Sequence, residues 1–358
     1  MNPASALLAL LALADPAAVR QLFDAAAAAL AKGDYDRAQA GFEQVLKAEP
    51  RNVGALGNLG VVYSRREQFD KAAAAYRKAL EIAPGDPGLL VNLGLALLKQ
   101  ERYADARAPL EKLIRIQPAH RQGRELAATA RLYAGDAVGA LSLLETLEPS
   151  PGVWFLLALA NLKTGKRAEA AAAFERLESA LGREQAAFLR GKACYESGLF
   201  DEAARELEPV AAALPEARRE LGKVYVSLRR GEEAEATFRR VLEDRPGDPE
   251  SAYFLGALLV ERGELAEGAA FLERANPGFW GTHYYLGKAA LKRRASAEAL
   301  RRLRLADELQ PGNASVLFQL LRASQAAGDV AGAARAAERL KAVSAKQREK
   351  EQSELVLR

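Results

Sequence analysis

Few side chains in this sequence have the chemistry of a catalytic base or nucleophile. Its 358 residues include two histidines, His120 and His283, and one cysteine, Cys194. Such residues act in catalysis beside positioned partners, yet the sequence has no G-x-S-x-G, H-E-x-x-H or phosphate-binding glycine motif. The many carboxylates lie in helical and turn segments without a distinct acid–base pair. We therefore expect no catalytic residue, no metal site, no cofactor and no small-molecule substrate, and so a protein that is not an enzyme.

The composition is that of a helical protein with nearly balanced charge. Aromatic residues are 7% of the chain, and no run alternates between apolar and polar residues with the two-residue period of a strand. The net charge of +4 is too small to indicate nucleic acid or an anionic membrane as a partner. No apolar run reaches the roughly 18 residues of a transmembrane helix. We expect an all-α fold without such a helix.

The first residues leave the cellular location open. The run ALLALLALA, residues 6–14, has the length of a signal-peptide core, and Ala12-Leu13-Ala14 resembles a cleavage site. Against a signal peptide, no lysine or arginine precedes this run, whereas a signal peptide begins with a positively charged region. Residues 1–18 are interpreted as an N-terminal apolar segment, either a signal-peptide remnant or a cover for the first helix. A cytoplasmic location is favoured, and a periplasmic or exported one follows if residues 1–14 are cleaved. Abundant alanine and a preference for arginine over lysine suggest a GC-rich bacterial genome.

Small residues recur at fixed places along the chain. Gly60 lies inside one helical segment and Ala72 inside the next. A glycine in a helix interior costs about 1 kcal/mol relative to alanine, so its recurrence indicates a packing contact that needs it. Twelve residues separate the two small positions, in every unit but the last. The equivalents of Ala72 follow in steps of 30 to 34 residues: Ala38, Ala72, Ala106, Ala140, Ala170, Ala203, Ala234, Gly268, Ala299 and Ala333.

This unit resembles the tetratricopeptide repeat, whose pattern is L-G-x-x-Y, then A-x-x-x-F, then P. One unit carries the residues Leu59, Gly60, Tyr63, Ala72, Tyr76 and Pro84. Ten units in register make the chain similar to a tetratricopeptide repeat protein over residues 19–345, with residues 346–358 as a polar C-terminal cap or tail. The resemblance implies a right-handed α-solenoid, or superhelix, of about ten helix-turn-helix units. Gly60 and Ala72 would mark the crossing of one helix pair.

Prolines interrupt the regular spacing at two places. The step falls to 30 residues near Pro149 and Pro151, and Pro277 lies in the irregular segment NPGFWGTH. Because proline ends helices, these sites are interpreted as shortened loops or local changes of superhelix pitch. A division of the array into sub-blocks is the alternative.

The resemblance also implies a concave groove lined by the first helix of each unit. Asn58 and Asn92 would hydrogen-bond the backbone of an extended peptide, since an amide both donates and accepts. An apolar wall would take apolar anchors or be covered by ordinary packing: Val91, Leu95, Leu98, Phe155, Leu159 and Leu162.

From the sixth unit onward the implied lining becomes basic and aromatic. One motif position holds Phe188, Arg219, Tyr253, Tyr284 and Phe318, a second holds Lys192, Lys223, Lys288 and Arg322, and a third holds Lys292. Cations beside rings suit an acidic peptide or a carboxylate with bulky anchors. The alternative is that the rings fill space and the cations are simply solvated.

Our hypothesis is a non-enzymatic scaffold or adaptor that binds protein segments in its concave groove, namely extended peptides with apolar anchors and acidic groups. A structural subunit that self-associates through the apolar wall or the NPGFWGTH segment is one alternative. An RNA-binding repeat protein is another, based on the cluster KAALKRRASAEALRRLR at residues 288–304. Salt separates the RNA-binding alternative, because phosphate-driven binding weakens steeply as salt rises. A measurement of size across a concentration series separates self-association from a monomeric adaptor.

Overall fold

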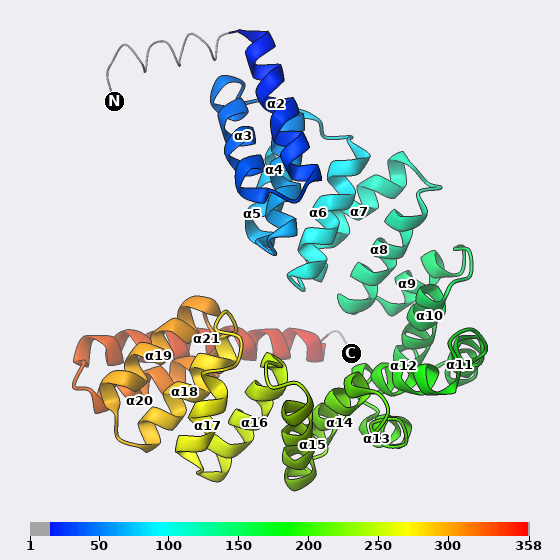
Figure 1. The fold of residues 1–358 in the computed structure, drawn as a ribbon. Coiled ribbons are helices and arrows are strands. Elements are labelled where there is room, and N and C mark those ends of the chain that lie inside the picture. The colour runs from blue at the N-terminus through cyan, green and yellow to red at the C-terminus, as the bar shows by residue number, and fades with distance from the viewer. Residues whose placement is uncertain (1–14, 357–358) are drawn as a thin grey trace. The chain divides into compact units, whose positions relative to one another are not determined.

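The computed structural model describes residues 15–356, and every regular element in that range is an α-helix (Figure 1). This confirms the all-α fold and the ten helix-turn-helix repeats. No described helix is long and apolar enough to span a bilayer. The apolar run at residues 1–14, and with it the question of a signal peptide, lies outside the described residues.

The chain forms two compact units, which meet in the sequence at Gly182 and Arg183. Each contains five helix pairs. The first unit consists of α2 (Pro16–Ala31), α3 (Tyr35–Ala48), α4 (Val53–Arg65), α5 (Phe69–Ile82), α6 (Pro87–Lys99), α7 (Tyr103–Ile116), α8 (Arg121–Tyr133), α9 (Ala137–Leu144), α10 (Pro151–Lys163) and α11 (Arg167–Leu181).

The second unit follows the same plan. It consists of α12 (Arg183–Glu196), α13 (Phe200–Leu207), α14 (Pro215–Ser227), α15 (Gly231–Asp244), α16 (Pro249–Arg262), α17 (Leu265–Leu272), α18 (Trp280–Lys292), α19 (Ser296–Leu309), α20 (Ala314–Ala326) and α21 (Val330–Val356). Within each unit, every helix packs against the helix that follows it in the sequence. Residues 346–356, expected as a polar cap or tail, continue helix α21.

The small residue in each first helix has a structural reason. A Cβ atom added to Gly60 would lie 2.5 Å from the ring of Tyr76, one helical turn beyond the fully buried Ala72. The same spacing of sixteen residues places Leu110 against Gly94 and Leu303 against Gly287. The glycine therefore leaves room for a large side chain of the paired helix, and that room offsets its low helix propensity.

The turn inside each helix pair has one residue with a left-handed backbone. Six of the ten are glycines, and the other four are Glu67, Glu101, Arg229 and Arg294, with φ between 56° and 61°. A left-handed conformation costs a residue with a Cβ roughly 1–2 kcal/mol. The repeated turn geometry thus prevails over the local preference of these four residues.

Some repeats are shorter than the others because their second helix is shorter. Helices α9, α13 and α17 have 8 residues, whereas α3, α5, α7, α15 and α19 have 14. The loops that follow the three short helices are longer than the loop between α3 and α4. The interpretation of the 30-residue step as a shortened loop is therefore wrong, because the contraction lies in the helix. The proline sites also do not coincide with the boundary between the units, which lies at Gly182.

Candidate protein-binding surface

The first helices of successive pairs contact one another as well as their own partners. In the first unit these contacts join α2 to α4, α4 to α6, α6 to α8 and α8 to α10. In the second unit they join α12 to α14, α16 to α18 and α18 to α20, and ion pairs join α14 to α16. Side chains on one stripe of these helices therefore form a continuous face within each unit, which we call the first-helix face.

The first unit places the expected asparagines and apolar wall on α4, α6 and α10. Asn58 and Asn92 are half-buried. Two members of the wall are internal, since Val91 packs beside Leu90 and Leu113 and Leu159 is fully buried. The remaining members are half-buried: Leu95, Leu98, Phe155 and Leu162. These four, and not Val91 or Leu159, supply apolar surface that a partner could reach.

The second unit carries a chain of aromatic rings on α16, α18 and the loop between α17 and α18, which we call the aromatic cluster: Tyr253, Phe254, Phe279, Trp280, Tyr284 and Tyr285. Neighbouring rings have centroids 5.0 to 6.0 Å apart, mostly edge to face. Phe279 is 37% exposed and the other five rings are half-buried. Edge-to-face packing holds the rings together, so the cluster presents a rigid, partly exposed aromatic surface.

Gly281, in the first turn of α18, explains how the rings approach one another. A Cβ at this residue would lie 2.6 Å from the ring of Phe279 and 2.8 Å from the Tyr253 hydroxyl. Burial raises the pKa of Tyr285 to about 12 and also raises that of Tyr253. Both phenols therefore stay protonated at neutral pH and keep a hydroxyl donor.

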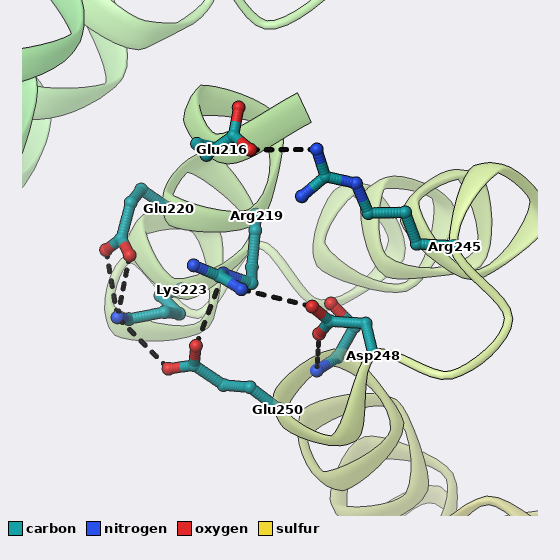
Figure 2. A network of polar contacts seen from close by, with 8 residues as sticks. Glu216, Arg219, Glu220, Lys223, Arg245, Asp248 and Glu250 are labelled. Atoms are coloured by element: carbon teal, nitrogen blue, oxygen red, sulfur yellow. Dashed lines mark hydrogen bonds and ion pairs between the residues drawn. The ribbon is translucent and has the colours of Figure 1, made fainter. Parts of the chain in front are cut away.

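The expected cations of α14 are held in a network with carboxylates (Figure 2). We call Arg219, Glu220, Lys223, Asp248 and Glu250 the ion-pair network. The guanidinium of Arg219 lies 3.0 Å from the Asp248 carboxylate and 3.2 Å from that of Glu250. The ammonium of Lys223 lies 2.9 Å from Glu220 and 3.3 Å from Glu250. Neither cation is free to meet a partner without a change in these contacts.

Burial and charge act in opposite directions on the network. Desolvation lowers the pKa of Arg219, but the charges of Glu250 and Asp248 outweigh it and leave the pKa above its ordinary value. The same balance, with Glu220 and Glu250, raises the pKa of Lys223. Desolvation raises the pKa of Asp248, but hydrogen bonds from Ser251 and the Arg219 charge lower it overall. Arg219, Lys223 and Asp248 are therefore ionised at neutral pH.

The other expected cations also have partners. Lys288 lies 2.5 Å from the Glu261 carboxylate and 5.9 Å from the centre of the Tyr285 ring. Lys292 donates to the Val260 carbonyl at 2.8 Å. Lys192 lies 4.0 Å from Glu196. The stripe that the sequence presents as basic is thus largely charge-balanced.

The remaining expected residues lie at the two ends of the second unit. Phe318 on α20 is 49% exposed, and the nearby Arg322 is exposed and hydrogen-bonds Gln319 at 3.4 Å. Phe188 on α12 is half-buried. The structure therefore brings together the expected residues on α14, α16 and α18, while Phe318 and Arg322 extend the face along α20.

Sequence reasoning missed the acidic partners and four rings of this surface, Phe254, Phe279, Trp280 and Tyr285. Glu220 and Glu250 lie on the first helices, at groove-facing positions like those of the cations, so their position was a usable signal. Asp248 precedes Pro249 as the N-cap of α16. The sequence shows Phe279 and Trp280 only as part of the irregular segment NPGFWGTH. Their place in the cluster depends on packing between α16 and α18.

The basic cluster at residues 288–304 is also partly neutralised. Arg293 lies 3.5 Å from Glu298, Arg304 lies 2.8 Å from Asp329, and Arg302 pairs with Glu273. His283 and Cys194 are buried. In the part of the chain that the structure describes, no three His, Cys, Asp or Glu side chains are grouped to hold a metal ion.

Models of the tetratricopeptide repeat match the chain over residues 23–87, 155–218 and 219–281, and a second model of the same repeat matches residues 65–130. The chain belongs to the tetratricopeptide repeat family, whose members are typically non-enzymatic protein-interaction scaffolds. No curated protein sequence matches it.

Several solved structures are similar to this chain at low sequence identity. The MamA protein is 22% identical over 45% of this chain and 90% of its own, with a TM-score of 0.43. The human IFIT1 dimer with m7Gppp-AAAA is 15% identical over 89% of both chains, with a TM-score of 0.43. The APC/C hetero-tetramer Cut9-Hcn1 is 14% identical over 91% of this chain and 73% of that chain, with a TM-score of 0.48.

Proposed function

We propose that this protein is a scaffold that binds extended segments of other proteins on its first-helix faces. The observation that carries this function is the aromatic cluster of the second unit, continued by the half-exposed Phe318. Partly exposed, rigid aromatic groups cost little conformational entropy when they bind, and they are enriched in the energetic centres of protein interfaces. A surface of this kind suits a segment with apolar or aromatic anchors.

The two units would contribute different contacts to a bound segment. In the first unit, Asn58 and Asn92 would bond the backbone, and Leu95, Leu98, Phe155 and Leu162 would accept apolar side chains. In the second unit, Tyr253, Tyr284 and Phe318 would accept bulky anchors. Acidic groups of the segment would pair with Lys288, Lys292 and Arg322, which lie beside these rings on α18 and α20.

The test is selection of binding peptides from a random library, followed by calorimetry of the best peptide. We expect Tyr284→Ala to weaken binding by roughly tenfold or more, as truncation of a central interface aromatic does. The matched control is Phe271→Ala, which removes a half-buried ring from α17, a second helix. Equal effects of the two variants, or no selected peptide, would contradict the proposal.

Measurements on the same purified protein distinguish two other functions from peptide binding. Self-association through the exposed Phe279 predicts a mass that rises with protein concentration in sedimentation and falls in Phe279→Ala. RNA binding through residues 288–304 predicts an affinity that drops steeply with salt. Binding through apolar and aromatic anchors predicts a monomeric protein with a weak salt dependence.

A further inference from the structure

The carboxylate of Glu250 bridges the two cations of α14 (Figure 2). One oxygen lies 3.2 Å from the Arg219 guanidinium, and the other lies 3.3 Å from the Lys223 ammonium. This is the position that the carboxylate of a bound acidic segment would take if it used both cations. The position is occupied by a side chain of the protein itself.

The charges of the network make it a poor acceptor of a further acid. Arg219 and Lys223 supply two positive charges, while Glu220, Asp248 and Glu250 supply three negative charges. Without Glu250 the network would be neutral, and each cation would keep one carboxylate partner, Asp248 or Glu220. An incoming carboxylate would then restore the arrangement that Glu250 now makes.

Glu250 differs from the other two carboxylates in how readily it can leave. Its side chain is 40% exposed, against 9% for Asp248 and 10% for Glu220. Asp248 also caps α16 by accepting the Ser251 amide at 2.7 Å. Glu250 lies in the first turn of α16, where a negative charge is favoured by the helix dipole whether or not it is paired. Release of Glu250 alone therefore leaves the rest of the network in place.

We propose that Glu250 is an autoinhibitory residue, which holds Arg219 and Lys223 closed until the acidic group of a partner segment displaces it. The inference rests on the proposed function, and it assigns these two cations to an acid-binding position that is regulated by exchange. In that exchange two ion pairs of Glu250 break, two ion pairs of the partner carboxylate form, and Glu250 becomes solvated. Displacement of Glu250 costs free energy, so the site favours segments that also bind through anchors elsewhere on the first-helix face.

The experiment measures binding of a fluorescein-labelled, capped hexaglutamate peptide at low ionic strength by fluorescence anisotropy. The variant is Glu250→Gln. The matched control is Glu216→Gln, because Glu216 also lies in the first turn of a first helix, has a similar exposure of 46% and forms its ion pair with Arg245 rather than with Arg219 or Lys223. Both variants remove one negative charge, but only Glu250→Gln releases Arg219 and Lys223. Thermal unfolding of each variant verifies that it is folded.

We expect Glu250→Gln to bind hexaglutamate roughly threefold to tenfold more tightly than the parent, since it removes two partly exposed ion pairs. Glu216→Gln should change the affinity by less than about twofold, because Glu216 makes no ion pair with Arg219, whose charge is only the weakest influence on it. The double variant Arg219→Gln/Glu250→Gln should lose the gain.

Three results would overturn the autoinhibitory role. These are no gain in Glu250→Gln, an equal gain in Glu216→Gln, or a gain that persists when Arg219 is also replaced. In each case the peptide selection with Tyr284→Ala decides separately whether the scaffold function holds. A selected peptide that depends on Tyr284 would leave that function standing without the regulation by Glu250.

Discussion

In the first unit the first-helix face is lined by asparagines and half-buried aliphatic side chains, whereas in the second it carries an aromatic cluster and an ion-pair network. The helix pairs beneath are built alike: Gly60 and Gly222 leave the same space for Tyr76 and Phe238. The residues that pack the two helices of a pair together are thus different from the residues that line the first-helix face. A repeat can keep its packing and still present a different chemistry in each unit.

The largest effect should come from filling the shared packing site in one unit at a time. Gly60→Val and Gly222→Val would each drive a branched side chain into the ring of Tyr76 or Phe238. We expect each to lower the free energy of unfolding of its own unit by about 2–3 kcal/mol, because overpacking exceeds the gain in helix propensity. Hydrogen exchange followed by mass spectrometry resolves the two units.

The control for overpacking is Gly231→Ala, at the start of α15, where an added Cβ would meet no atom within 4 Å. It should be neutral or mildly stabilising. If Gly60→Val raised exchange equally in both units, the division of the chain at Gly182 would not describe its unfolding.

A smaller effect concerns the ion-pair network and pH. Since the pKa of Asp248 is lowered in the folded protein, its stabilisation is complete above the unfolded pKa of about 4 and is lost as the pH falls through the folded pKa. Asp248→Asn removes this contribution. The difference in unfolding free energy between parent and variant should be about 1 kcal/mol at neutral pH and should shrink below about pH 4.

Urea titrations of both proteins across this pH range measure that difference. A gap that stays constant or widens in acid would mean that the Asp248 carboxylate does not stabilise the fold through its charge. Because Asp248 and its partner Arg219 both lie in the second unit, the effect should appear there.

The smallest effect should come from the turns inside the helix pairs. Glu101→Gly in the first unit and Arg229→Gly in the second relieve a left-handed residue that carries a Cβ. We expect each to raise the unfolding free energy by about 0.5–1 kcal/mol, the relief exceeding the added entropy of the unfolded chain. The reverse change Gly135→Ala, at a φ of 92°, should destabilise by a similar amount. Thermal melts of the three variants decide whether the turn geometry is equally strict in both units.

The fold could be predicted from the sequence because its signals are local and repeated. A small residue recurs at the Ala72 position in ten units and at the Gly60 position in nine, so many weak patterns support one register. The sequence also shows the 30-residue step between Ala140 and Ala170, but it does not show the cause of that step. A shortened helix and a shortened loop change the period alike, and only the structure shows that α9 is short.

The candidate site was predictable by position but not by chemistry. The repeat pattern places Arg219, Lys223 and Tyr253 on first helices, and the structure finds them there. Whether a cation is free depends on a carboxylate from the next repeat, such as Glu250, which is 31 residues from Arg219 in the sequence. No local pattern reports that partnership, because it depends on how closely two helices pack and which way long side chains turn.

By itself, the sequence determined a helical repeat array and the positions of its packing residues, because each unit repeats the same short-range interactions. Only the tertiary structure decided the division after Gly182, the joining of Phe279 and Trp280 to the rings of α16 and α18, and the closure of Arg219 and Lys223 by Glu250. These features depend on distances between separate helices, and such distances are set by packing rather than by the order of residues along one helix.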